Sequence, residues 1–135
     1  MEACPFCVHE DDEVLVYADE CCYALIDLHP INHHHLVLVP REHFRHFVDL
    51  PDALVAHLFV IAKRLSRALR ESVEVEAVHH ISDDDLTGDY NLVQHYKLHL
   101  IPRYPDDGIS MTWSRDDATH AQRIAYAADI RGRLR

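Results

Sequence analysis

The chain is poor in the residues that keep a polypeptide unfolded. Its 135 residues include only 3 glycines and 6 prolines, whereas 48% are hydrophobic. This composition argues against disorder and supplies enough apolar side chains for a core of its own. No internal repeat, low-complexity stretch or linker interrupts it. We therefore expect one domain, with its main part over residues 1–114 and a helical extension of the same domain over residues 115–135.

Positive charge is also scarce. The chain has 13 Lys and Arg residues against 23 Asp and Glu residues, which gives a formal net charge of −10 at pH 7. A protein this acidic repels the phosphates of a nucleic-acid duplex and the surface of an anionic membrane. Any anion that it binds must therefore be held by a local group of side chains.

Long apolar runs and a secretion signal are missing as well. No uncharged run approaches the roughly 20 residues of a membrane span, and the start, MEACPFC, has neither a basic region nor an apolar signal core. We expect a cytoplasmic protein without a membrane partner. In that compartment its 4 cysteines are thiols or metal ligands rather than a disulfide framework.

Hydrophobic periodicity predicts the elements. Short runs rich in Val, Leu, Ile and Tyr predict strands over residues 13–18, 22–28, 36–39, 73–81 and 92–101, the third ending before Pro40. Over residues 51–71 the apolar period changes to three or four, which predicts a long helix. A second helix is expected from residue 115 onward, entered from Ser114, Asp116 and Asp117. The sum is an α+β domain with a mainly antiparallel sheet, one long helix and a C-terminal helix.

The stretch QHYKLHLIPRY, residues 94–104, carries the densest chemistry. Its apolar residues alternate with His95, Lys97 and His99. Because successive side chains of a strand point to opposite faces, we expect these three titratable groups to share one face.

The second constellation is the CPFC motif. Cys4 and Cys7 can grip one metal ion, but two ligands leave a tetrahedral zinc half filled. We expect His43 and His95 to complete it. Two alternatives stay open: a redox pair, although no helix pattern follows the motif to lower a thiol pKa, and two cysteines without a shared role.

These motifs together resemble a known family. CPFC, then VYADECCYALIDLHPINHHHLVLVPREH (residues 16–43), HYKLHLIPR (95–103) and GISMTW (108–113) resemble the histidine triad, or HIT, family of nucleotide hydrolases and transferases in order and spacing. The resemblance covers roughly residues 4–113. It implies a small α+β fold, usually a homodimer, in which a central histidine attacks the α-phosphorus of a nucleotide and forms a transient nucleotidyl-histidine. The amphipathic tail and Trp113 add weak support for a dimer.

The resemblance also implies roles for single residues. It implies that Cys4, Cys7, His43 and His95 are the ligands of a structural zinc ion. It makes Asp27 the acid that binds the ribose hydroxyls, with Ile26 and Leu28 lining a slot for the base, although apolar residues at strand spacing are more often core. His35 then matches the buried histidine that supports the triad, and His99 matches its third member.

The chain departs from the family at the nucleophile. Lys97 occupies the position of the central histidine. A protonated lysine has no lone pair, so it attacks phosphorus only if its ordinary pKa of about 10.4 is strongly lowered. The alternative is a fixed cation that binds a phosphate or pairs with an aspartate.

A second departure is the loop before the last strand. Asn91 keeps an amide of the family's phosphate-binding run, whereas Leu92 replaces a hydroxyl. The loop also holds four acids that would repel a phosphate: Asp83, Asp84, Asp85 and Asp89. They are either a site for Mg²⁺ or Mn²⁺, or, as we favour, a solvated acidic loop.

Two functions follow from the sequence. In the first, the protein is a nucleotidyl hydrolase or transferase acting on a nucleoside phosphate derivative, with Asp27, Lys97 and His99 in its site and His35 behind them. In the second, it is a zinc-stabilised dimer that binds a nucleotide-like or other small ligand without nucleotidyl transfer.

Overall fold

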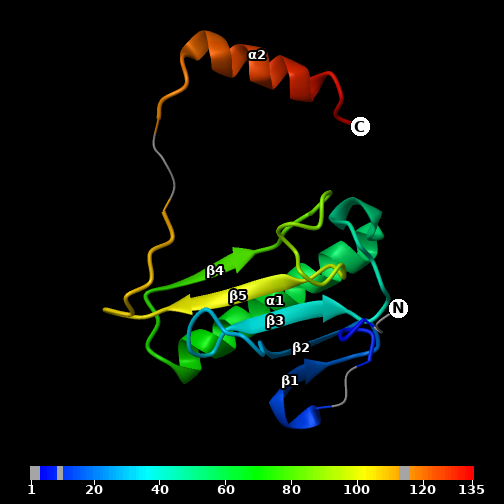
Figure 1. Cartoon of the computed structure of the whole chain (residues 1–135), viewed down its shortest axis with the longest axis vertical. Coiled ribbons are helices and arrows are strands. Elements are labelled where there is room, and N and C mark those ends of the chain that lie inside the picture. Colours follow the sequence, from blue (N-terminus) through cyan, green and yellow to red (C-terminus); the bar gives the residue numbers. More distant parts are fainter. Residues whose placement is uncertain (1–3, 9–10, 113–115) are drawn as a thin grey trace.

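The computed structural model describes residues 4–8, 11–112 and 116–135. Its elements in chain order are η1 (Asp12–Val14), β1 (Leu15–Ala18), β2 (Cys22–Ile26), β3 (Leu36–Pro40), η2 (Phe47–Asp49), α1 (Asp52–Ser72), β4 (Ala77–Ile81), β5 (Leu98–Arg103) and α2 (His120–Arg131). The strands form one sheet in the order β1-β2-β3-β5-β4, and every neighbouring pair is antiparallel. The predicted α+β architecture is confirmed (Figure 1).

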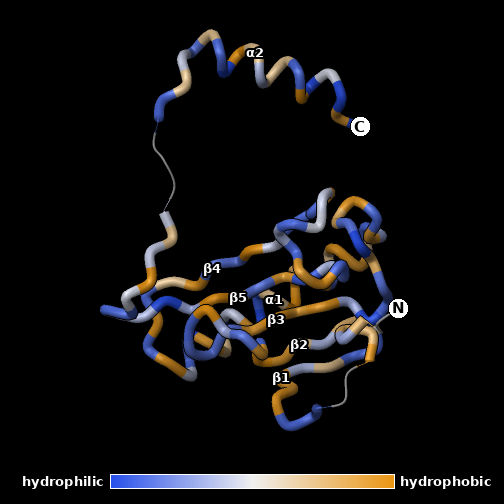
Figure 2. The backbone as a smooth tube through the Cα atoms, in the orientation of Figure 1, coloured by the Kyte–Doolittle hydropathy of each residue, from blue (hydrophilic) through white to orange (hydrophobic). Residues whose placement is uncertain are grey.

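Helix α1 covers one face of the sheet. Its apolar residues recur every three or four positions, so Leu58, Ile61, Leu65 and Leu69 lie along one side, and all are buried. They pack against the strand residues that point toward the helix, such as Leu38 of the central strand. Figure 2 shows the hydrophobic colouring gathered in the strands beneath α1. This layer is the main core.

The opposite face of the sheet is only partly covered. Tyr23, Val37 and Val39 form a smaller buried cluster there, and Phe6 of the N-terminal segment packs against it. The Tyr23 hydroxyl donates a hydrogen bond of 2.5 Å to the Phe6 carbonyl. The segment over residues 4–8 is thereby held against one end of this face, while the remainder stays open.

Asp19 joins the turn between β1 and β2 to α1. Its carboxylate accepts hydrogen bonds from the Tyr17 hydroxyl and His57 Nε2, each 2.6 Å, and from the backbone N–H groups of Cys21 and Cys22. The bonds from Tyr17 and His57 hold the pKa of Asp19 well below its ordinary value against the opposing effect of burial. Burial raises the pKa of the Cys22 thiol to about 12, so this group stays neutral.

The last strand begins later than predicted, at Leu98 rather than residue 92. The segment before it uses its backbone groups elsewhere: the Tyr96 N–H donates to the Phe44 carbonyl at 2.6 Å, and the Val93 and His95 carbonyls accept from the Lys97 side chain. Pro40, at the facing end of β3, also has no N–H to offer a ladder. The structure therefore corrects the strand over residues 92–97 to an irregular segment.

Other boundaries shift by a few residues. The β4 strand begins at Ala77 rather than residue 73, because Val73 is the C-cap of α1. Helix α2 begins at His120 rather than 115, where Thr119 and Gln122 form a capping box. The expected cap Ser114 and the aromatic Trp113 lie outside the described residues.

The C-terminal helix stands apart from the domain. All residues of α2 are exposed, and Figure 1 shows it clear of the sheet and α1. The described part of the tail thus makes no shared core with the rest of the chain. Neither helix in the described residues has the length and apolarity needed to cross a membrane.

Candidate functional site

Four predicted metal ligands meet at the end of the sheet where residues 4–8 are held. The Cys4 Sγ atom lies 3.4 Å from His95 Nδ1, and Cys7 Sγ lies 3.3 Å from His43 Nδ1 and 3.6 Å from His95 Nδ1. One donor atom from each of the four residues falls within 4.8 Å of the others. Ligands roughly 2.0 to 2.3 Å from one tetrahedral ion lie roughly 3.3 to 3.8 Å apart, so this spacing fits a zinc ion.

The buried His95 is held in the tautomer that a metal requires. Its Nε2 lies 2.8 Å from the Pro40 carbonyl oxygen, which can only accept, so Nε2 carries the hydrogen. The Nδ1 lone pair of the neutral ring then faces Cys4 and Cys7. Burial lowers the pKa of His95, which favours that neutral form. A carbonyl behind a ligating histidine is the usual second partner in metal sites.

A cavity of about 480 Å³ opens on the partly covered face of the sheet, next to this cluster. It is lined by Pro5, Phe6, Leu25, Asp27, Leu28, His29, Ile31, His35, Val37, Asp83, Tyr90, Asn91, Leu92, Val93, Lys97 and His99. Most of the wall is apolar, and three of its titratable residues, Asp27, His35 and His99, bring polar atoms within 4.8 Å of one another. This combination is typical of a small-molecule site.

A chain of hydrogen bonds orients His99 in this cavity. The Ile31 N–H donates to His35 Nδ1 at 3.0 Å, so the hydrogen of neutral His35 is on Nε2. That atom lies 2.9 Å from His99 Nδ1 and donates to it. His99 consequently carries its own hydrogen on Nε2, its remaining polar atom. Burial lowers the pKa of both rings against the opposing charge of Asp27, so both are neutral near pH 7.

Asp27 lies beside this pair. Its Oδ1 accepts from the His29 N–H at 2.8 Å, while Oδ2 lies 3.8 Å from His35 Nε2 and 3.7 Å from His99 Nδ1. These two distances are too long for hydrogen bonds. The carboxylate is therefore fixed by one backbone bond and keeps acceptor capacity toward the cavity.

Lys97 does not reach the cavity with a free amine. Its Nζ donates to the Asn91 side-chain oxygen, to the Val93 carbonyl at 2.7 Å and to the His95 carbonyl at 2.9 Å. Nζ also lies 5.1 Å from the centre of the Phe6 ring. The residue is 7% exposed, and burial lowers its pKa to about 8. The three hydrogens of an ammonium are all used, which ties the irregular segment to Asn91.

The acidic loop is organised by one buried carboxylate. Asp85 accepts from the backbone N–H groups of Thr87, Gly88, Tyr90 and Asn91, which lower its pKa well below the ordinary value. Gly88 has φ of 92°, a conformation that suits glycine in this tight loop. Asp85 thus holds the loop in shape.

The other loop acids point in different directions. Asp84 accepts from the Phe47 N–H at 3.0 Å and lies 3.5 Å from His46 Nδ1, while Asp83 lines the cavity. None of the residue groups that could hold an ion in the described chain includes a loop acid. Magnesium or manganese at this loop stays a prediction without structural support.

The structure separates residues that the alternation had put together. Lys97 and His99 line the cavity, whereas His95 turns to Cys4 and Cys7. Ile26 packs against the main core under α1 and is not among the lining residues. Its neighbour Leu25 lies on the cavity side with Asp27, as strand alternation requires.

Sequence reasoning missed Phe6 and Leu25. Phe6 packs 5.9 Å from the His95 ring, centre to centre, and lines the cavity. Its position between Cys4 and Cys7 was the available signal, because a metal that fixes both cysteines also fixes the residue between them. Asn91, expected at the ligand, lines the cavity; its side-chain oxygen accepts from Lys97 and its Nδ2 donates to the His95 carbonyl at 3.4 Å.

Comparison with known families identifies the family of this chain. The sequence profile of the HIT domain family matches residues 8–106. The chain belongs to the HIT domain family. A HIT-family crystal structure from Bacillus subtilis superposes with a TM-score of 0.86 over 99% of each chain, at 24% identity. At that identity the likeness speaks for the fold alone.

Two further similar proteins are known with a bound metal or with an activity. A zinc-bound histidine triad family protein from Mycobacterium smegmatis is 26% identical, with a TM-score of 0.66 over 76% of this chain and 74% of its own. The adenosine 5′-monophosphoramidase of Saccharomyces cerevisiae is 25% identical over 115 residues, which cover 82% of this chain and 70% of the yeast protein.

Proposed function

We propose that this HIT-family protein binds a nucleoside monophosphate unit in its cavity and does not form a nucleotidyl-lysine. The observation that carries the second part is the set of three oxygen acceptors around Lys97 Nζ. An amine needs a lone pair directed at phosphorus to attack it. Here all three directions around Nζ point to oxygens of the protein, so the group acts as a fixed cation.

The cavity offers a place for each part of such a ligand. Leu25, Ile31 and Val37 give an apolar wall for a base. Asp27 Oδ2 is an acceptor for ribose hydroxyls, and His99 Nε2–H is a donor for a phosphate oxygen. The positive charge of Lys97 lies at the same end and favours an anion even though its hydrogens are used. The yeast relative, which acts on an adenylyl compound, supports this ligand class.

A structural zinc ion belongs to the same proposal. Cys4, Cys7, His43 and His95 would hold it, and the donor set, spacing and tautomer of His95 fit that ion. A closed site with four protein ligands supplies folding free energy rather than chemistry. Within this chain it would hold Phe6 against the cavity and keep His95 in place. The zinc-bound relative supports the assignment.

The relay of His35 and His99 favours a second candidate function, slow hydrolysis of an adenylyl derivative by direct attack of water. In it, water would attack the phosphorus as the P–N bond of the phosphoramidate breaks, and the proton of that water would pass to the departing amine, so that AMP and ammonia are the products. His99 Nε2–H would hydrogen-bond to the departing group while Asp27 holds the ribose. The bond from His35 to His99 would keep that hydrogen on the cavity side. No covalent intermediate on Lys97 is needed for this reaction.

The test is calorimetric titration with AMP, together with intact mass and product analysis after incubation with adenosine 5′-phosphoramidate. We expect AMP to bind, Asp27→Asn to weaken binding by about tenfold, and the intact mass to stay unchanged. Loop-exposed Asp89→Asn is the matched control. Accumulation of AMP without an adduct would select the second candidate. An adenylyl adduct on Lys97 would refute the proposal, and so would the absence of AMP binding at millimolar concentrations.

The variant Lys97→His tests whether nucleotidyl transfer through a histidine differs from what the parent chain does with Lys97. Histidine there restores the family's nucleophile, so turnover of the phosphoramidate should rise above that of the parent chain. If the parent already turns over at the rate of this variant and Lys97→Met abolishes it, Lys97 is catalytic and the proposal is wrong.

A further inference from the structure

One carboxylate in the wall of the cavity has no partner in the binding mode proposed above. Asp83 lines the cavity, and within the part of the chain that the structure describes it makes no hydrogen bond or ion pair. Its neighbours in the loop differ. Asp84 accepts from the Phe47 N–H, and Asp85 accepts from backbone N–H groups of its own loop. Asp83 therefore borders the ligand space with its acceptors unused.

The order of the strands sets out where each part of the ligand lies. Asp27 follows β2, His99 lies on β5, and Asp83 follows β4, the edge strand beside β5 (Figure 1). Ile81 at the end of β4 pairs with His99. Because these strands are antiparallel, the chain beyond Ile81 runs toward the start of β5, next to Lys97. With the ribose at Asp27 and the phosphate at His99, a group attached to the phosphate extends toward Asp83.

The charges around the cavity agree with this placement. Burial lowers the pKa of Lys97 and His99, and the charge of Asp83 is among those that oppose this effect at each of them. With histidines counted as neutral, the lining holds two carboxylates, Asp27 and Asp83, against one cation, Lys97. Lys97 can balance one negative charge on a phosphate. The second charge that free AMP carries near pH 7 would lie next to Asp83 and be repelled.

An ammonium group is the cation that suits Asp83. A divalent metal ion prefers six or more oxygen ligands in all, usually with more than one carboxylate from the protein. Asp84 and Asp85 cannot supply them, because their carboxylates are bonded to backbone groups. An ammonium has three hydrogens, of which one can bond to the carboxylate while the others bond to water. The unused acceptors of Asp83 therefore indicate a ligand with an ammonium group.

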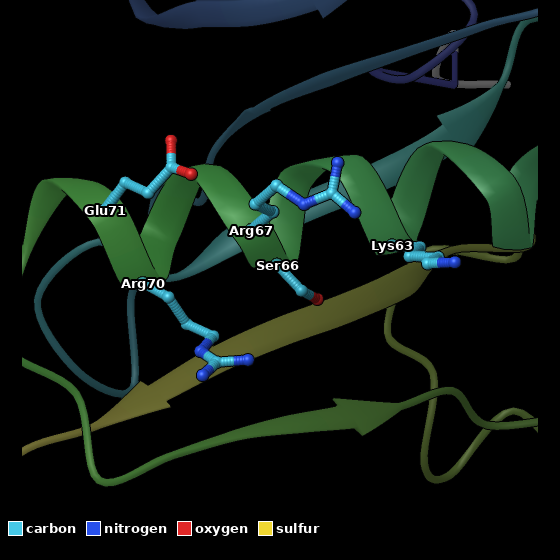
Figure 3. A pocket seen from close by; sticks show the side chains of 5 residues that line it. All are labelled: Lys63, Ser66, Arg67, Arg70 and Glu71. Atoms are coloured by element: carbon cyan, nitrogen blue, oxygen red, sulfur yellow. The ribbon is translucent and has the colours of Figure 1, made fainter.

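An anion without such a group has a better site elsewhere on the molecule. Another cavity, of about 410 Å³, lies along α1, and Figure 3 shows its five lining residues, Lys63, Ser66, Arg67, Arg70 and Glu71. Its three cations have no hydrogen bond or ion pair to any described residue. All five lining residues are polar or charged, so this α1 groove suits simple anions better than a nucleoside. It provides the control for binding that depends on negative charge alone.

We propose that Asp83 selects a nucleotide whose 5′-phosphate carries a substituent that ends in an ammonium group. In such a ligand the phosphate keeps one negative charge beside Lys97, and the ammonium pairs with Asp83. The proposal rests on the proposed function, because it takes the cavity as the site of a nucleoside monophosphate unit. It adds the charge of the group attached to the phosphate, which the contacts to base and ribose do not specify.

Calorimetric titration with two esters of AMP tests this selection. The 2-aminoethyl ester and the n-propyl ester have nearly the same shape and one charged phosphate oxygen, but only the first has an ammonium group. Neither has a P–N bond, so binding is measured without hydrolysis of a phosphoramidate. We expect the parent chain to bind the aminoethyl ester about fivefold more tightly. Asp83→Asn should bind both esters equally, whereas Asp83→Glu, which keeps the charge, should retain the preference.

Two control variants locate the effect. Exposed Asp89→Asn, in the same loop, and Arg67→Ala, in the α1 groove, should keep the preference of the parent chain. Raising NaCl from about 0.05 to about 0.5 M should reduce the preference of the parent and leave Asp83→Asn without one. A preference lost in Arg67→Ala would place the esters in the α1 groove and overturn the proposal.

The remaining outcomes separate this proposal from the proposed function. Equal binding of the two esters by the parent, or a preference that survives Asp83→Asn, overturns the selection but leaves the nucleotide site in place. If millimolar MgCl₂ strengthens AMP binding to the parent but not to Asp83→Asn, Asp83 serves a metal ion, and the ammonium is refuted. If neither ester nor AMP binds, the proposed function fails and the selection fails with it.

Discussion

Two clusters of this protein look alike as lists of residues and differ in chemistry. Cys4, Cys7, His43 and His95 bring four donor atoms within 4.8 Å, and Asp27, His35 and His99 bring three within the same limit. In the first cluster the second nitrogen of His95 donates to a carbonyl. That bond leaves a lone pair facing the thiols, which is the arrangement a metal ion needs.

In the second cluster the second nitrogen of His35 accepts from the Ile31 N–H. The hydrogen of His35 therefore sits on Nε2 and points into the cluster, where it is donated to His99. An ion placed there would have to displace that hydrogen. The ring nitrogen of each histidine that points away from its cluster has a hydrogen-bond partner. That partner decides whether the other nitrogen offers a lone pair to a cation or a hydrogen to a neighbour, even when the ligand spacing is similar.

The largest effect should come from breaking the first cluster. Cys4→Ser removes one proposed zinc ligand and should lower the free energy of unfolding by about 4 kcal/mol or more. Exposed Cys21→Ser is the control. Metal analysis of the parent should give about one zinc per chain, because the second cluster binds none. Two zinc ions per chain would contradict the expectation that only the first cluster binds metal. A folded chain without metal would refute the zinc site in the first cluster.

The next effect concerns the cation between the clusters. Lys97→Met keeps an unbranched side chain, one atom shorter than lysine, but leaves the Asn91, Val93 and His95 oxygens without their donor. We expect a loss of about 2 to 3 kcal/mol in urea unfolding, from buried acceptors left unpaired. Exposed Lys63→Met should change stability by less than about 0.5 kcal/mol. An equally small effect at Lys97 would mean that its bonds do not hold the loop.

The histidines of the second cluster should make the free energy of unfolding depend on pH. Burial lowers the pKa of His35 and His99 in the folded chain, so below their ordinary value of about 6.5 the unfolded chain takes up protons first. Stability should be constant above that pH and fall below it, by at most about 1.4 kcal/mol per pH unit for each ring.

His35→Gln isolates this contribution from protonation of the zinc ligands. Urea unfolding between pH 5 and 7.5 should show a shallower loss of stability in acid for this variant than for the parent. Exposed His33→Gln should follow the parent curve. If the His35→Gln and parent curves are parallel, His35 does not resist protonation in the folded chain.

The smallest effects should separate the two faces of β2. Ile26→Ala should lower the free energy of unfolding by about 1 to 2 kcal/mol and leave AMP affinity unchanged, because Ile26 packs under α1. Leu25→Ala should weaken AMP binding by a few fold, because Leu25 lines the cavity. The reverse pattern in calorimetry and urea unfolding would place the ligand on the other face.

Strands and helices could be predicted from the sequence where apolar residues recur with a clear period over a long enough run. The period of α1 gave its bounds to within one residue, since each buried position follows from the helical repeat. The segment over residues 92–97 alternates like a strand but is not one, because its carbonyls bond to Lys97 and its Tyr96 N–H bonds to Phe44. Alternation reports which way side chains point and does not report where backbone groups find partners.

The sequence by itself determined the α+β class, the family resemblance, the candidate zinc ligands and the oddity of Lys97. Only the tertiary structure decided the tautomers of His35, His95 and His99 and the use of the Lys97 hydrogens. The reason is physical: residue type sets what a group can donate or accept, but its partner comes from a distant part of the chain. Pro40 lies behind His95 and Asn91 beside Lys97 only once the sheet and its loops have folded.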